Sequence, residues 1–199
     1  MMRASLLCLL IVGAAAVAQQ SAPPASGTQA IYQAEARNAQ RKFDYIRENA
    51  KRKSPSSAPT VITENEINAW LASGQAELPK GVKKLQLRGE PGRIKAHAVV
   101  DFDEVREGRS SMNPLLALFR GTHEIEAEAR AQGSGGEGHV HIETVSLDGV
   151  EIPHIALEYF VEKYVTPKHP GIGLDSTFKL AYRIETATVG VRKLTVVQQ

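Results

Sequence analysis

The sequence predicts an α+β domain with a curved, antiparallel sheet of about six strands, one face of which is covered by three helices, preceded by an N-terminal helix. Two patterns predict this class. After residue 82, apolar and polar residues alternate over several stretches, as they do in strands with one buried face and one wet face. Before residue 75, and between the strand pairs, apolar residues recur instead at helical spacing.

Residues 1–18 have the features of a cleavable secretory signal. Arg3 precedes an apolar run over 6–12, and the triplet Ala16-Val17-Ala18 has the small-x-small form that predicts cleavage after Ala18. The alternative is a retained membrane anchor, for which this alanine-rich stretch is weakly apolar. We therefore expect an exported protein that is periplasmic or extracellular. Cleavage also removes Cys8, the only cysteine, so the mature chain has no disulfide.

Residues 19–58 are expected to form a flexible leader, a basic helix and a linker rich in proline and serine, ahead of a single α+β domain over 59–199. Between 28 and 53 the chain has seven basic residues against three acidic ones. This excess suits docking on an anionic membrane surface or an acidic partner, and a solvated helix with one face on the domain explains it as well. The apolar stripe that predicts the helix is Tyr32, Ala36, Ala39, Phe43, Ile46 and Ala50.

A second helix is predicted to begin at Thr63. Thr63 and Glu66 have the spacing of a capping box, in which each side chain binds a backbone N–H at the first turn. Trp70, the only tryptophan, follows on the apolar side of this helix. Because a large indole on an apolar helix face usually packs inside the fold, we expect Trp70 to anchor the core.

Two hairpins, each closed by a glycine-containing turn of four residues, account for the centre of the predicted sheet. Their strands are expected over 82–88 with 93–103, and over 122–132 with 137–147. A long strand over 177–189 and a short one over 194–197 complete the sheet.

Short apolar helices are predicted over 115–119 and 153–165, each beginning at a proline that suits the first turn of a helix. We expect both helices to cover the apolar side of the sheet and to leave an apolar groove along the seam. The same side chains also suit an ordinary filled core. The candidate ligand-binding residues are Leu115, Leu118, Phe119, Ile155, Phe160 and Tyr164.

The second hairpin contains a candidate metal site. His139 and His141 share one face of a strand, and pairing Gln132 with Glu137 would place Glu128 opposite His141. Two histidines and a carboxylate can hold zinc or ferrous iron, which would allow a metal-dependent hydrolase. The same pairing puts Arg130 opposite His139, and cross-strand charged pairs account for all these residues, so we expect no metal.

No motif in the chain names a reaction. The glycines of 133–138 lack a following helix and lysine, so they form a hairpin turn and not a phosphate-binding loop. A net charge of +2, from 24 basic and 22 acidic residues, is far from the basic excess of a nucleic-acid binder. We expect a protein that is not an enzyme, needs no cofactor and does not bind nucleic acid.

The final third of the chain resembles a known family. The run 145–153, the apolar helix after it, Gly171-Ile172 and the strand pair ending at 190–197 look like a pattern in LmeA-like and AsmA-like bacterial envelope proteins. This resemblance implies a TULIP-like architecture, with a curved sheet wrapped on a helix and an apolar groove for acyl chains. It implies no catalytic residue.

The sequence thus supports two functional hypotheses. The first is a non-enzymatic envelope protein that binds a lipid or another hydrophobic ligand between sheet and helices, because apolar walls with few polar groups suit acyl chains. The alternative is a structural or interaction module that docks on a partner or an anionic membrane through the basic helix at 28–53.

Overall fold

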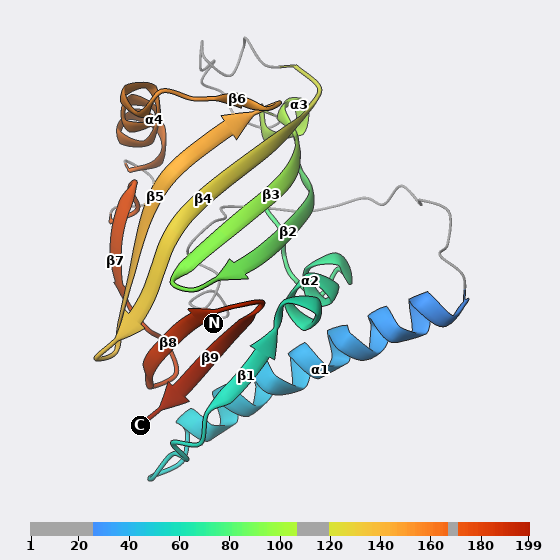
Figure 1. Cartoon of the computed structure of the whole chain (residues 1–199), viewed down its shortest axis with the longest axis vertical. Coiled ribbons are helices and arrows are strands. Elements are labelled where there is room, and N and C mark those ends of the chain that lie inside the picture. Colours follow the sequence, from blue (N-terminus) through green and yellow to red (C-terminus); the bar gives the residue numbers. More distant parts are fainter. Residues whose placement is uncertain (1–25, 107–119, 167–170) are drawn as a thin grey trace.

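A computed structural model describes residues 26–106, 120–166 and 171–199 (Figure 1). The predicted signal at 1–18 and the predicted helix at 115–119 lie outside the described residues. The helices are α1 (Ser26–Ala50), α2 (Glu64–Ala72), α3 (Phe102–Arg106) and α4 (His154–Phe160), which continues into the π-helical turn η1 (Val161–Val165). The strands are β1 (Thr60–Thr63), β2 (Val82–Glu90), β3 (Arg93–Asp101), β4 (Thr122–Ser134), β5 (Glu137–Leu147), β6 (Val150–Glu151), β7 (Asp175–Lys179), β8 (Ile184–Gly190) and β9 (Lys193–Gln198).

All of these strands belong to one antiparallel sheet. The main path runs in the order β1-β9-β8-β4-β3-β2, and β5 pairs with β4, β6 and β7. The predicted α+β class, the antiparallel sheet and the leading helix are confirmed. The sheet has nine strands among the described residues instead of about six, because β1, β6 and the separate β7 add to the expected set.

The single long strand predicted over 177–189 is wrong. The chain forms β7, reverses direction, and then forms β8, so the two halves pair with different neighbours. The reversal occurs at Tyr182 and Arg183, which have φ angles of 56° and 55°. Left-handed backbone is uncommon for residues other than glycine and marks a turn here. Apolar and polar residues keep alternating across this turn in the sequence, so the pattern did not indicate the turn.

Helix α1 is part of the domain core. Its predicted apolar stripe is confirmed at Ala36, Ala39 and Ile46, which are buried, whereas Tyr32 at the start of the stripe is 45% exposed. Ile46 packs in a cluster with Ile62 of β1 and with residues of β8 and β9. The core therefore extends beyond residues 59–199 and includes the helix that was expected to lie in the leader region.

Helix α2 packs beside the β2 edge of the sheet. Leu71 packs with Leu85 of β2 in a second buried cluster. Trp70 joins the same cluster, stacks edge-on against Phe43 of α1 with ring centroids 4.8 Å apart, and donates its indole N–H to Gln40 Oε1 at 2.8 Å. The prediction that Trp70 anchors the core is confirmed, and this contact joins α2 to α1.

The helices cover the sheet differently from the sequence expectation. Figure 1 shows α1 and α2 beside β1 and the β2 edge, whereas α4 lies at the opposite end of the molecule beside β5. No residue of α4 is buried, so this helix does not cover the apolar side of the sheet as predicted. Ile155, which was expected to face the sheet, is 81% exposed.

A pair of buried amides fixes the end of α1 to the last strand. Asn49 and Gln198 are 1% and 3% exposed, and the Asn49 amide donates to Gln198 Oε1 at 2.9 Å. The Gln198 amide in turn donates to the carbonyls of Ile46 and Tyr182, at 2.8 and 2.6 Å. Each polar group thereby replaces a hydrogen bond that it would otherwise make with water.

Replacing Gln198 with alanine is expected to destabilise the fold. The change removes the donor for two buried carbonyls and the acceptor for Asn49, and unsatisfied buried groups cost about 1–3 kcal/mol. Urea unfolding of Gln198→Ala should show a lower free energy of unfolding by this amount. The neighbouring Gln199 is exposed, so Gln199→Ala is the matched control and should unfold as the native chain does. Equal stability of the two variants would contradict the assignment.

Candidate functional site

The predicted ligand-binding residues do not come together in one described site. Leu115, Leu118 and Phe119 lie outside the described residues, as does the side chain of Tyr164. Phe160 is half-buried, and Ile155 is exposed.

The apolar side of the central strands is the first feature that the structure offers instead. Strand register places Leu85, Ala98, Ile125 and Leu147 in one row across β2, β3, β4 and β5. Two more rows run parallel to it. They are Leu87, Ala96, Ala127 and Val145, and then Gly89, Ile94, Ala129 and Ile142.

We call the part of these rows on β3, β4 and β5 the alanine face. All of its side chains are half-buried, because neighbouring side chains in the sheet surround them on several sides. Small alanine side chains lie at its centre, between the larger Ile, Val and Leu side chains. The alanine face consists of Ile94, Ala96, Ala98, Ile125, Ala127, Ala129, Ile142, Val145 and Leu147.

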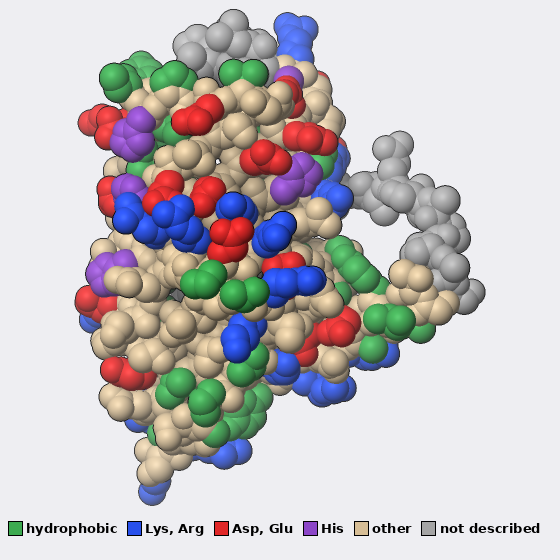
Figure 2. Space-filling model, in the orientation of Figure 1, with side chains coloured by type: hydrophobic (Ala, Val, Ile, Leu, Met, Phe, Trp, Pro, Cys, Tyr) green, Lys and Arg blue, Asp and Glu red, His purple; other side chains and the backbone are tan. Residues whose placement is uncertain are grey.

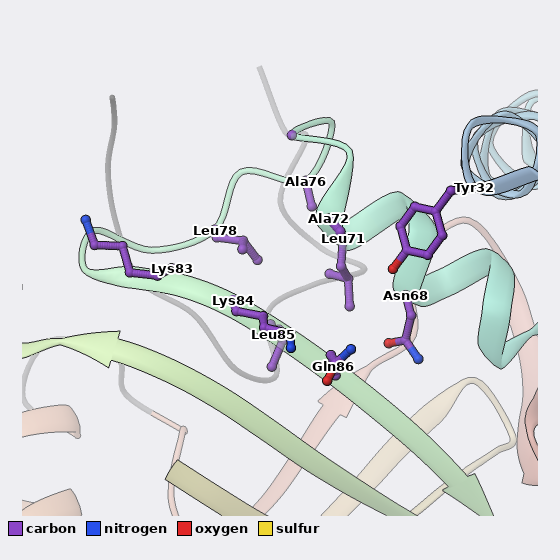
Figure 3. Close-up of a pocket in the computed structure, with 11 residues that line it drawn as sticks. Tyr32, Asn68, Leu71, Ala72, Ala76, Leu78, Lys83, Lys84, Leu85 and Gln86 are labelled. Carbon is purple, nitrogen blue, oxygen red and sulfur yellow. The ribbon is translucent and has the colours of Figure 1, made fainter. Parts of the chain in front are cut away.

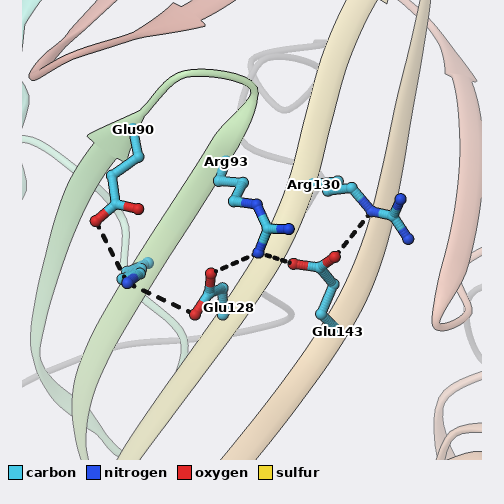
Figure 4. A network of polar contacts seen from close by, with 6 residues as sticks. Glu90, Arg93, Glu128, Arg130 and Glu143 are labelled. Carbon is cyan, nitrogen blue, oxygen red and sulfur yellow. Dashed lines mark hydrogen bonds and ion pairs between the residues drawn. The ribbon is translucent and has the colours of Figure 1, made fainter.

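The opposite side of the same strands carries charged residues of both signs. Figure 2 shows them gathered over the middle of the molecule, and Figure 4 shows how they pair. Arg93 contacts Glu128 at 2.9 Å and Glu143 at 2.6 Å, and Glu143 also pairs with Arg130 at 2.9 Å. Lys95 extends the network, at 3.7 Å from Glu128 and 3.3 Å from Glu90.

This network is electrically balanced. The hydrogen bond to Glu128 raises the pKa of Arg93, and the same bond holds the pKa of Glu128 below its usual range. Exposed pairs of this kind contribute little stability each, because water competes for both partners. The polar side of the sheet is therefore a solvated surface whose charges are satisfied by one another.

The proposed metal ligands do not meet. Gly135 and Gly136, with φ angles of 62° and 75°, make a two-residue turn, so Gln132 pairs with His139 and not with Glu137. The shift places Arg130 opposite His141, and Glu128 lies opposite Thr144. The predicted pairing of β4 with β5 is therefore wrong by two residues.

Each histidine of the pair has its own neighbour on β7. His139 Nδ1 lies 3.0 Å from Thr177 Oγ1, and His141 pairs with Asp175. Within the described ranges, no group of three histidine, cysteine, aspartate or glutamate side chains is arranged to hold a metal ion.

A second feature is a pocket of about 270 Å³ between α2, the segment after it and β2 (Figure 3). Leu71, Leu78 and Leu85 point towards one another inside it, and Tyr32 of α1 stands at one side. Lys84 contributes an ammonium group, the ammonium of Lys83 pairs with Glu104 outside the lining, and the lining contains no carboxylate. The pocket is therefore apolar within and positively charged at its margin.

This pocket was not predicted from the sequence, although one signal for it is present there. Strand alternation breaks at Lys83 and Lys84, where two polar residues follow one another. The structure has a register shift between Val82 and Lys84 at the same point. Such an irregularity redirects side chains near a site, but the partner helix that completes the pocket is not evident from the strand sequence.

The comparisons with known proteins identify no relative. No family model, curated protein or solved structure was found to match this chain. Among the described helices, none combines the length and apolar character needed to cross a bilayer.

A buried carboxylate is one of the contacts that position α2, and hence the pocket. Glu66 is 5% exposed, accepts the backbone N–H of Thr63 at 2.7 Å and contacts Lys42 of α1 at 2.6 Å. Thr63 Oγ1 accepts the Glu66 N–H, which confirms the predicted capping box. Burial by itself raises the pKa of Glu66, but hydrogen bonds from Lys42 and Thr63 outweigh burial and hold this pKa below its usual range.

This shift predicts a pH dependence of stability. Because the folded-state pKa of Glu66 is the lower one, its carboxylate stabilises the fold above the unfolded-state pKa and loses that contribution as the pH falls through the folded-state pKa. Glu66→Gln should lower the free energy of unfolding near neutral pH by about 1–3 kcal/mol and flatten its decline in acid. Chemical unfolding across the acid range measures both effects.

The exposed Glu77 provides the control for this experiment, since Glu77→Gln leaves the joint between α1 and α2 intact. If Glu66→Gln keeps the native decline in acid, another group is responsible for it.

Proposed function

We propose that this chain is an exported envelope protein without enzymatic activity, and that it binds a lipid or another hydrophobic ligand between the sheet and its helices. The alanine face supports this proposal most directly. It is a broad apolar surface whose side chains are only half-buried, and contiguous apolar surface that stays accessible often marks a binding site.

The chemistry of the alanine face favours an acyl chain or a similar ligand. Its side chains carry no polar atom, so they offer dispersion contacts and removal from water but no hydrogen bond. Helix α2 borders the face, because Leu71 packs in one cluster with Ala96 and Ala98. The ligand would thus lie on the sheet with α2 at one side. The resemblance of 145–153 and 190–197 to LmeA-like proteins supports the same class of ligand.

The first test asks whether the protein carries a ligand. Native mass spectrometry of protein purified from its own cell envelope is expected to detect an additional bound mass that is released into organic solvent. A spectrum free of ligand under gentle conditions would count against lipid carriage.

The second test places the ligand on the alanine face. Ala127→Phe fills the centre of the face with an apolar ring and should weaken binding of the neutral probe N-phenyl-1-naphthylamine. The new ring removes from the probe a contact area equal to that of about two methylene groups, which costs about 1.6 kcal/mol, or on the order of tenfold in Kd. Fluorescence titration measures this change.

Glu126→Phe is the matched control, since residue 126 lies next in β4 and faces the charged side of the sheet. Equal probe affinity of the two variants, with both folded by circular dichroism, would place the ligand elsewhere.

A second candidate function is docking on an anionic membrane through α1. Arg37, Arg41 and Tyr45 recur at steps of four along α1, and all three are exposed. Ile31, further towards the start of α1, is 66% exposed. Cations beside exposed apolar side chains favour the surface of a negatively charged bilayer.

The charge-reversing double variant Arg37→Glu/Arg41→Glu should reduce co-sedimentation with vesicles that contain phosphatidylglycerol. The double variant Lys179→Glu/Lys193→Glu changes the net charge equally at exposed positions away from α1, so it should keep most of the binding. If both double variants lose binding to the same extent, the effect is one of overall charge and α1 has no special role.

A further inference from the structure

The pocket beside β2 lies at an open edge of the sheet. Leu85 faces the apolar side of β2, and Lys84 and Gln86 face the other side, yet all three line the same pocket. Side chains of both faces meet one cavity only where the cavity lies at the strand's edge. The edge of β2 is free on the side away from β3, because β2 ends the main strand path.

Polar groups of α2 and the β8-β9 turn occupy the next positions along this edge. The Asn68 amide donates to the Leu87 carbonyl and accepts the Leu87 N–H, both at 2.8 Å, in the manner of a neighbouring strand. Two residues further on, Gly89 donates its N–H to Glu64 Oε2 at 3.1 Å, and its carbonyl accepts the N–H of Arg192 at 2.9 Å.

Leu85 is the next outward-facing position, and its edge is open. Backbone groups of an antiparallel strand point outward at every second residue, so the Leu85 N–H and carbonyl point the same way as those of Leu87. No described residue outside the sheet is bonded to them. Beyond Leu85 the edge closes again, since the Val82 N–H donates to the Pro79 carbonyl.

The charge at this edge is positive. Lys83 pairs with Glu104, but Lys84 has no ion-pair partner in the described part of the chain. A ligand that fills this pocket therefore gains from a negative group near Lys84, because a charge-assisted hydrogen bond is stronger than a neutral one.

We propose that this pocket binds the carboxyl-terminal end of an extended peptide whose last side chain is apolar. The peptide backbone pairs with the N–H and carbonyl of Leu85, its terminal carboxylate binds Lys84, and its last side chain enters the space between Leu71, Leu78 and Leu85. A chain end fits because Asn68 at Leu87 and Pro79 at Val82 occupy the edge on either side of Leu85, so a continuous strand has no room along β2.

A peptide suits this edge better than a fatty acid does. A fatty acid has a carboxylate and an apolar tail, but it has no N–H to satisfy the Leu85 carbonyl. The addition of a short strand to a free sheet edge, with a pocket for one side chain, is a recurrent mode of peptide recognition. This pocket adjoins the alanine face but shares no lining residue with it, so the inference does not depend on lipid binding there.

The experiment uses the full chain and two forms of one peptide. Acetyl-Ala-Ala-Ala-Leu with a free carboxylate should bind about tenfold more tightly than the same peptide with a terminal amide, since only the former bonds Lys84 with charge. Titration followed by amide nuclear magnetic resonance should shift the Leu85 N–H signal. Isothermal titration calorimetry gives the two dissociation constants.

Lys84→Gln should remove the preference for the free carboxylate and leave the amide form unaffected. Arg88→Gln is the control, because Arg88 is exposed on the same side of β2 but does not line the pocket. Equal binding of both peptides to the native chain would overturn the proposal. Decanoate binding that depends on Lys84, in a chain that binds neither peptide, would also overturn the proposal. Thermal unfolding of each variant verifies that the variant is folded.

Discussion

The contact between Lys42 and the buried carboxylate of Glu66 holds the molecule's helical part in place. Glu66 is bonded at once to the first turn of its own helix and to α1, and together with Trp70 it fixes how α2 packs on α1. Tyr32 of α1 and Leu71 of α2 line the pocket together, and its shape therefore depends on that packing. A buried charge is costly unless it is fully bonded, which makes this joint specific as well as tight.

The central sheet has two chemically different sides. Glutamate and arginine side chains on one side satisfy one another, and small apolar side chains on the other side leave a shallow surface. The helices at the β2 edge and at β1 cover only part of that apolar surface. The sheet thus has one solvated, charged side and one apolar side, the alanine face. The open edge at Leu85 adds backbone hydrogen-bonding groups.

Local sequence signals predicted the local structure well. The Thr63 and Glu66 spacing predicted a cap that is present, and alternation in 93–103 and 122–132 predicted which side chains share a face. Long-range arrangement was less accessible. Nothing in the apolar pattern of α4 indicated that it would lie away from the core, and the pocket residues come from elements that only tertiary packing brings together. The register error at His139 arose because a run of four turn-forming residues does not fix the length of the turn.

The amide of Asn68 has a wider consequence. A free strand edge is a template on which another copy of the chain can pair, and long open edges lead to aggregation. Asn68 occupies the position at Leu87, and the partners of Gly89 and Val82 occupy the positions on either side, so the free part of this edge is limited to Leu85. One side chain on a short helix thereby protects this edge of the sheet from pairing with a second copy of the chain.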